Sequence, residues 1–148
     1  MFNQILQETE AKAEAGAEAA YQLANFAEER VDYLEALKLF EKAVQLAPEN
    51  ALYLNDAGFI LKNLAHYDKA IEYYEKALAS NLKTFGVNHP SVATHWNNLG
   101  SAWDAKGEFD KAIEYYEKAL QVLEKADLQH LVEKVKASIA GLKKDQQR

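Results

Sequence analysis

Eleven consecutive residues, Asp-Lys-Ala-Ile-Glu-Tyr-Tyr-Glu-Lys-Ala-Leu, occur twice in this chain, from Asp68 to Leu78 and again from Asp110 to Leu120. The two copies are 42 residues apart, and a more divergent copy at 35–44 aligns with 69–78 at an offset of 34. Periods in this range are typical of stacked helical repeats, in which each unit covers the apolar face of its neighbour. The chain is therefore predicted to be a repeat protein, and such proteins usually hold other molecules on an extended surface.

Apolar residues recur at spacings of three and four along the chain, which predicts amphipathic helices. In the second unit, Leu54, Ala57 and Leu61 fall on one face of a first predicted helix. Ala70 and Tyr74 fall on one face of a second helix, after a short turn. Small residues at matching places let two helices approach closely, while aromatic side chains fill the space beside them.

This pattern resembles the tetratricopeptide repeat family, whose 34-residue unit has Trp, Leu, Gly and Tyr on its first helix and Ala, Phe or Tyr, Ala and a late Pro afterwards. The best match is in the third unit, with Trp96, Leu99, Gly100, Trp103, Ala112, Tyr116 and Ala119. The resemblance implies an all-α fold, a right-handed α-solenoid of three helix-turn-helix units plus a C-terminal capping helix. The implied single domain consists of an N-terminal helical extension at 1–16, repeats at 17–50, 51–92 and 93–126, and a capping helix at 127–148.

The second unit carries eight residues more than the 34-residue pattern. Its segment from Thr84 to Ala93, followed by Asn97-Asn98-Leu99-Gly100, resembles the 42-residue repeat subtype of kinesin light chains. Within that resemblance, His89-Pro90 is expected to be a linker element that starts the next helix.

The last part of the chain has one apolar and one charged face, as a capping helix requires. The apolar stripe is Leu128, Leu131, Val132, Val135, Ile139 and Leu142. We expect this helix to cover the last repeat.

Patterns that carry chemistry are weak in this sequence. The chain has no cysteine, which excludes disulfides and thiolate nucleophiles. Its histidines (His66, His89, His95 and His130) are not spaced as zinc ligands on one helix, and its glycines form no phosphate-binding loop. We therefore predict that the protein is not an enzyme and uses no metal or other cofactor.

The net charge and the N-terminal residues argue against nucleic-acid-binding, secreted and membrane proteins. A net charge of -6 argues against nucleic-acid binding, which needs a basic surface to neutralise phosphates. The first residues have neither a basic start nor the apolar run of a signal peptide, and no segment is apolar for long enough to span a membrane. The sequence thus predicts a cytoplasmic protein without membrane or nucleic-acid partners.

The resemblance assigns a set of first-helix positions to the concave face of the solenoid, and these are our candidate peptide-binding residues. They are Tyr21, Asn25, Asn55, Phe59, Lys62, Asn97, Asn98 and Ser101. An amide side chain donates and accepts together, which suits a peptide backbone, and Tyr21 and Phe59 could be apolar anchors. The alternatives are that the amides are simply hydrated and that Phe59 packs against a neighbouring helix.

Charge on the same face limits the partner. Co-chaperone repeats that grip a C-terminal carboxylate use two Lys, two Asn and an Arg, and of these five only Asn25 is matched here. Tyr21, Asp56, Thr94 and Asn98 stand at the other positions, so no cation is available for a carboxylate. The acidic residues near the groove (Glu18, Glu28, Glu29, Asp56 and Asp104) face the single Lys62, which favours a neutral or basic partner segment.

The predicted function is a non-catalytic adaptor that binds a peptide segment of a partner protein in its concave groove. The alternative is a segment of a longer or self-assembling array, because the near-identical second and third repeats are interchangeable units that can stack. A secretion-type chaperone is a third interpretation, against which the 42-residue unit weighs. Whether the N-terminal segment fills the groove is open at this point.

Overall fold

The computed structural model describes the backbone of residues 2–29 and 32–147 and the side chains of residues 3–25 and 32–147. These residues form seven helices and no strand, which confirms the predicted all-α class. The helices are α1 (Phe2–Glu29), α2 (Tyr33–Leu46), α3 (Ala51–Asn63), α4 (Tyr67–Phe85), α5 (Pro90–Ala105), α6 (Phe109–Lys125) and α7 (Gln129–Gln146).

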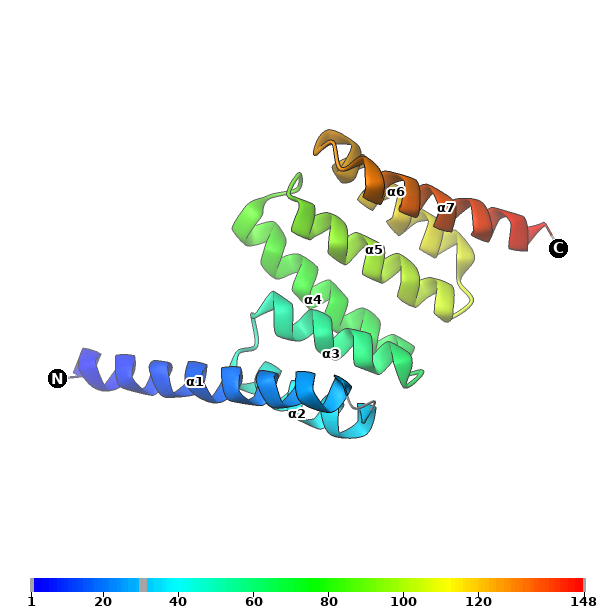
Figure 1. Cartoon of the computed structure of the whole chain (residues 1–148). Helices are drawn as coiled ribbons and strands as arrows, with labels where there is room; N and C mark the ends of the chain where they lie inside the picture. The colour runs from blue at the N-terminus through cyan, green and yellow to red at the C-terminus, as the bar shows by residue number, and fades with distance from the viewer. Residues whose placement is uncertain (1, 30–31, 148) are drawn as a thin grey trace.

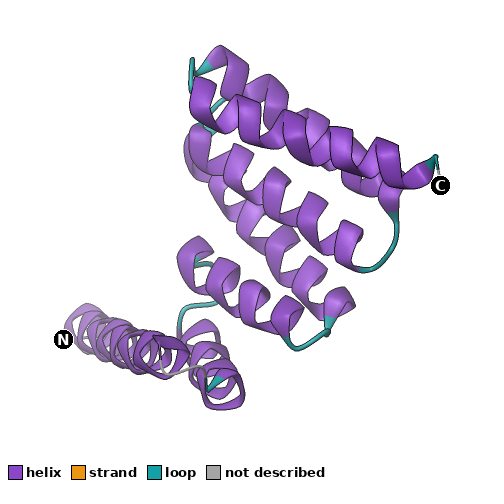
Figure 2. Cartoon of the chain, turned by 45° about the vertical axis from the view of Figure 1, so that its right-hand side comes forward, coloured by secondary structure: helices purple, strands orange, loops and turns teal. Residues whose placement is uncertain are grey.

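The helices stack in pairs along one direction (Figure 1). α1 packs with α2, α3 with α4 and α5 with α6, and each pair also packs against the next through α2 with α3 and α4 with α5. α7 packs on α6 at the far end of the stack, as the view in Figure 2 also shows. Each of the helices α2 to α7 thus buries apolar residues against its neighbours along the chain.

A tyrosine seated on a glycine sets the close approach of two of these pairs. A Cβ atom on Gly58 would lie 2.8 Å from the Tyr74 ring, and one on Gly100 would lie 2.6 Å from the Tyr116 ring. Only glycine therefore lets the ring lie directly on the facing helix backbone. The second and third repeats therefore contain the same contact, in which a tyrosine of the duplicated eleven-residue segment packs on a glycine of the preceding helix.

Contacts between repeats are made by buried side chains of the second helix in each pair. Phe40 of α2 packs with Ala57 and Ile60 of α3 in one buried cluster. Tyr74 of α4 shares a second cluster with Leu99 of α5. The core is therefore continuous from repeat to repeat.

The long connection between α4 and α5 ends as the sequence predicts. α5 begins at Pro90, whose missing N–H is not needed at the first helical position. The Nδ1 atom of His89 accepts a hydrogen bond of 3.1 Å from the backbone N–H of Ser91, and the His89 ring stacks on Phe85 at 4.1 Å. His89-Pro90 is confirmed as the element that starts the next helix.

α1 is a single helix that includes both the predicted N-terminal extension and the first helix of the first repeat. The side chain of Leu46, the last residue of α2, lies 3.3 Å from where a Cβ atom on Gly16 would be. The N-terminal half of α1 projects past α2, with residues 3–12 exposed (Figure 1). This segment does not fold back over α3 and α5, so it does not fill the predicted groove.

α7 covers the last repeat with its predicted apolar stripe. Val132, Val135, Ile139 and Leu142 are buried, and Leu128 and Leu131 pack beside them. Within residues 2–29 and 32–147, no helix combines the length and the apolar character needed to cross a membrane.

The tyrosine-on-glycine contact can be tested by adding one methyl group. We expect Gly100→Ala to lower the free energy of unfolding by about 1–2 kcal/mol, because displacing the Tyr116 ring costs more than the gain in helix propensity. Gly141→Ala, on α7 with nothing within 4 Å of the added Cβ, should raise it by up to about 1 kcal/mol. Urea unfolding followed by circular dichroism measures both. Equal stability of Gly100→Ala and the wild type would contradict the packing argument.

Candidate functional site

Four polar side chains join the first helices of the three pairs. The Tyr21 hydroxyl on α1 donates a 2.8 Å hydrogen bond to Oδ2 of Asp56 on α3, and Nδ2 of Asn55 donates to Oδ1 of Asp56 at 3.3 Å. Nδ2 of Asn98 on α5 donates to Oδ1 of Asn55. We call these four residues the polar row, and the surface that they occupy the α1–α3–α5 face.

The repeat period explains why these residues meet. Tyr21 and Asp56 are 35 residues apart, and Asn55 and Asn98 are 43 apart. Each separation is one residue more than the local repeat offset of 34 or 42. The residue at the fifth position of one repeat therefore contacts the residue at the sixth position of the next repeat. This contact occurs twice in the polar row, as Tyr21–Asp56 and as Asn55–Asn98.

Asp56 gives the polar row its charge. Burial raises the pKa of Asp56, although the hydrogen bonds from Tyr21 and Asn55 act in the opposite direction. Its two hydrogen-bond partners are a phenol and an amide, and neither carries a positive charge. The α1–α3–α5 face thus has a carboxylate at its centre.

Tyr21 is a packed residue and not a free anchor. Its ring lies 4.9 Å from that of Tyr53 and 5.8 Å from that of Phe40, measured between centroids. The Tyr53 hydroxyl in turn donates a 3.0 Å hydrogen bond to Oε2 of Glu18. Burial raises the pKa of Tyr21 and of Tyr53, so both phenols stay protonated donors. Tyr21 contributes mainly by holding Asp56 in place.

Phe59, Lys62 and Ser101 form a second group farther along α3 and α5, which we call the Lys62 group. The Lys62 ammonium donates a 2.9 Å hydrogen bond to Oγ of Ser101 and lies 5.6 Å above the Phe59 ring. Burial lowers the pKa of Lys62, while the charge of Asp104 opposes that shift. Phe59 is 40% exposed, so its ring has surface left for a partner.

The remaining predicted residues lie outside these two groups. Asn25 is half-buried on α1, one turn after Tyr21. Asn97 lines a cavity of about 180 Å³ together with residues of α6 and α7 that include Leu123, Leu131 and Val135. The structure thus separates Asn97 from its neighbour Asn98. The side chains of Glu28 and Glu29 lie outside the described residues.

Sequence reasoning missed the central position of Asp56 and the pairing of Tyr53 with Glu18. The sequence identified Asp56 as one of several acidic residues near the groove and as a mismatch to the Asn of a chaperone clamp, but not as the residue that joins α1 to α3. The pairs Tyr21–Asp56 and Glu18–Tyr53 are each 35 residues apart, which is the repeat offset of 34 plus one. A search of the sequence for polar residues at this separation could have found both pairs.

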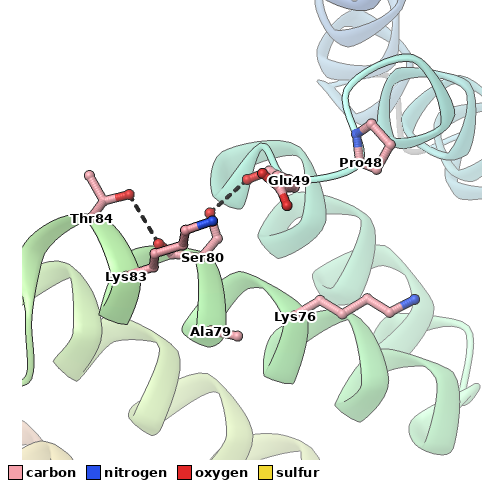
Figure 3. A pocket seen from close by; sticks show the side chains of 7 residues that line it. All are labelled: Pro48, Glu49, Lys76, Ala79, Ser80, Lys83 and Thr84. Carbon is pink, nitrogen blue, oxygen red and sulfur yellow. Dashed lines mark hydrogen bonds between the residues drawn. The ribbon is translucent and has the colours of Figure 1, made fainter.

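A different hollow lies between the α2–α3 turn and α4 (Figure 3). Its volume is about 640 Å³, and Pro48, Lys76 and Lys83 are among its lining residues. The Ser80 hydroxyl donates a 2.7 Å hydrogen bond to the Glu49 carbonyl across it, which ties the turn to α4. It shares no residue with the polar row, and we assign it a structural role at the junction of the first two repeats.

His95 is the buried polar residue of α5, with 4% of its surface exposed. Its Nε2 atom lies 2.8 Å from Nδ2 of Asn81, while its Nδ1 atom has no hydrogen-bond partner among the described residues. Burial lowers the pKa of His95 to about 4. The described part of the chain brings no three His, Cys, Asp or Glu side chains together as a metal site would require.

The buried histidine makes stability depend on pH. Between pH 6.5 and about 4, the folded chain keeps His95 neutral while the unfolded chain protonates it, so stability falls as the pH falls. The loss reaches up to about 3 kcal/mol at the acid end. We expect His95→Gln to flatten this dependence and His130→Gln, an exposed control, to retain it. Urea unfolding at pH 7, 5.5 and 4.5 measures the slopes.

Two acids titrate in the opposite sense in these experiments. Burial raises the pKa of Asp56 and of Asp104, so their protonation favours the folded chain at low pH. Their contribution is common to the wild type and to both variants, and the difference between slopes isolates His95. Equal slopes for the wild type and His95→Gln would contradict the assignment.

Two regions of the chain match tetratricopeptide repeats in a comparison with protein-family models, residues 17–50 and residues 48–125. Together they include the C-terminal part of α1, from residue 17, and all of α2 to α6. A comparison with curated protein sequences gave no match.

Several solved structures share the fold. BtubC (BKLC) from P. vanneervenii superposes with a TM-score of 0.78 and 22% identity, covering 86% of this chain and 55% of that chain. The type III secretion translocator chaperone SycD of Yersinia enterocolitica gives a TM-score of 0.74 at 19% identity, covering 90% of this chain and 96% of that one. The N-terminal domain of stress-induced protein-1 from C. elegans gives 0.68 at 19% identity, covering 84% and 97%. At these identities the likeness shows the helical-solenoid fold alone.

Proposed function

Because the chain belongs to the tetratricopeptide repeat family, we propose that it is a non-catalytic scaffold that binds a segment of a partner protein on its α1–α3–α5 face. Repeats of this kind generally serve as protein-interaction surfaces.

The observation that supports this proposal is the polar row itself. Its hydrogen bonds hold the Asn55 and Asn98 amides in fixed positions across two repeats. Each amide group keeps one N–H that these bonds do not use, and the Asn98 oxygen also remains an acceptor. A backbone that offers one N–H and one C=O per residue is a fitting ligand for preorganised amides, because little side-chain entropy is lost on binding.

The charge of the face favours a neutral or basic segment. Asp56 lies in the polar row, and Glu18 lies beside it on α1. The Lys62 ammonium is farther along, is hydrogen-bonded to Ser101 and is partly buried. A lysine or arginine in the partner could approach Asp56, and this attraction would chiefly raise the association rate.

Two finer sequence predictions stay predictions. One is the kinesin-light-chain-like subtype of the second repeat, which rests on the long connection through His89-Pro90 and on Asn97-Asn98. The other is the cytoplasmic location.

Peptide selection tests the proposed function. A random peptide library displayed on phage is selected on the immobilised chain, and the peptides obtained are labelled for fluorescence anisotropy. We expect Asn55→Ala/Asn98→Ala to weaken their binding by about 5- to 30-fold, the effect of losing two hydrogen bonds. Asn88→Ala/Gln121→Ala, which removes two exposed amides elsewhere, should leave affinity within about twofold.

Two results would overturn the proposal. One is a selection that yields no binding peptide. The other is a set of peptides whose affinity is the same for the wild type and Asn55→Ala/Asn98→Ala, which would move the interface to another face. Circular dichroism spectra of both double variants check that the helices are intact.

A second candidate function, stacking of another repeat on the α1–α2 end, is favoured by one exposed leucine. Leu23 occupies the first-helix position that Ala57 and Leu99 occupy in the second and third repeats. Ala57 and Leu99 are fully buried against the preceding repeat, whereas Leu23 is 56% exposed. Leu34 on α2 is 72% exposed. The stack is therefore open at this end, and a second copy is the simplest occupant.

Sedimentation velocity over a range of protein concentrations tests this second function. We expect a concentration-dependent dimer in the wild type and a monomer for Leu23→Glu, because a buried unpaired carboxylate would prevent docking. Leu52→Glu, which changes an equally exposed leucine on α3, serves as the control and should still dimerise. A wild type that sediments as a monomer at every concentration would exclude the dimer.

A further inference from the structure

A pocket of about 290 Å³ opens between α3, α4 and the start of α5. Its polar lining residues are Asn55, Asn81, Ser91, Thr94 and His95. Asn55 also belongs to the polar row, so this pocket adjoins the α1–α3–α5 face directly. A segment bound along the polar row therefore passes its entrance.

The lining of this pocket carries no formal charge at neutral pH. Its seven residues are apolar, amide, hydroxyl or imidazole side chains, and burial keeps the His95 imidazole neutral. A charged side chain entering the pocket would lose water without gaining an ion partner, which is unfavourable. The lining therefore favours an uncharged ligand group.

The hydrogen-bonding groups of the pocket include both donors and acceptors. Nδ2 of Asn81 is paired with Nε2 of His95, and this pairing leaves the Asn81 side chain with a carbonyl oxygen and a second N–H. The Thr94 hydroxyl donates to the Pro90 carbonyl at 3.3 Å and keeps its acceptor capacity. The Ser91 hydroxyl can do either. A ligand group that both donates and accepts complements this set.

His95, which lines this pocket, has one ring nitrogen that is unpaired in the part of the chain that the structure describes. This Nδ1 atom is buried without a hydrogen-bond partner among the described residues. Buried polar groups are nearly always paired, and an exception in a native fold calls for an explanation. A polar ligand in the adjoining pocket would change the surroundings of the His95–Asn81 pair, which borders it.

The size of the pocket limits the ligand further. Sites for whole small molecules usually measure about 300–1,000 Å³ and are mainly apolar. A pocket of about 290 Å³ with polar groups among its lining residues lies just below that range and suits one side chain of a larger ligand.

We propose that this pocket binds the carboxamide of a glutamine or asparagine side chain in the segment held on the α1–α3–α5 face. The carboxamide carries one acceptor and two donors on an uncharged group, which suits the lining. The inference rests on the proposed function, and it adds a sequence requirement for the partner that the polar row alone does not impose.

Two matched threonine variants test the pocket. Thr94 and Thr84 are both exposed helical residues whose hydroxyls donate to the carbonyl four residues earlier. Thr94→Phe places a ring at the pocket, whereas Thr84→Phe places one at the hollow beside α4 that Figure 3 shows. The probes are the phage-selected peptides described above, with the Gln or Asn of each peptide replaced by Glu in a second series.

We expect the selected peptides to share a Gln or Asn at one position. Thr94→Phe should weaken their binding by about tenfold or more, and Thr84→Phe should leave it within about twofold. Replacing the shared Gln or Asn by Glu should weaken binding to the wild type by a similar factor. The Glu peptides should bind Thr94→Phe as weakly as the Gln or Asn peptides do, because both changes remove the same contact.

The outcomes separate this inference from the proposed function. Peptides that lose affinity with Asn98→Ala but not with Thr94→Phe would retain the proposed face and overturn the pocket. Selected peptides without a shared Gln or Asn would do the same. Loss of binding with Thr84→Phe alone would place the ligand at the hollow beside α4 and overturn both proposals, as would a selection that yields no peptide.

Discussion

The whole arrangement depends on the distance between the two helices of a repeat, and a ring lying on a glycine sets that distance. In the second and third repeats, Tyr74 lies on Gly58 and Tyr116 lies on Gly100. Because a ring against bare backbone permits one close separation, each first helix is fixed relative to its own second helix. The second helix then packs on the first helix of the next repeat, which places one pair of helices relative to the next.

The fold could be predicted from the sequence because its signals are local and repeated. The duplicated eleven-residue segment, the three- and four-residue apolar spacing and His89-Pro90 each specify structure over a few turns of helix. The candidate site was predicted only in part, because contacts between repeats depend on the offset of one helix against the next. Helical phase placed Asn55 and Asn98 on one face, but it gave no reason to choose Asn98 over Asn97 as the partner of Asn55.

Asp56 is a clearer example of a site residue whose surroundings the sequence could not predict. Composition identifies it as one acid among many, whereas the structure surrounds it with a tyrosine hydroxyl and an amide. Its raised pKa comes from burial, which depends on residues 35 positions away and cannot be read from its neighbours in sequence. The charge on the face is thus a property of the stacked repeats and not of a single helix.

The two ends of the stack differ, and this difference limits how the protein can assemble. α7 covers one end with buried valine, isoleucine and leucine side chains, while Leu23 leaves the other end exposed. Copies that joined head to tail would need two complementary ends, and only one is available. Two copies that associate through their open ends would therefore pair identical surfaces about a twofold axis, which closes at two copies and does not extend into a filament.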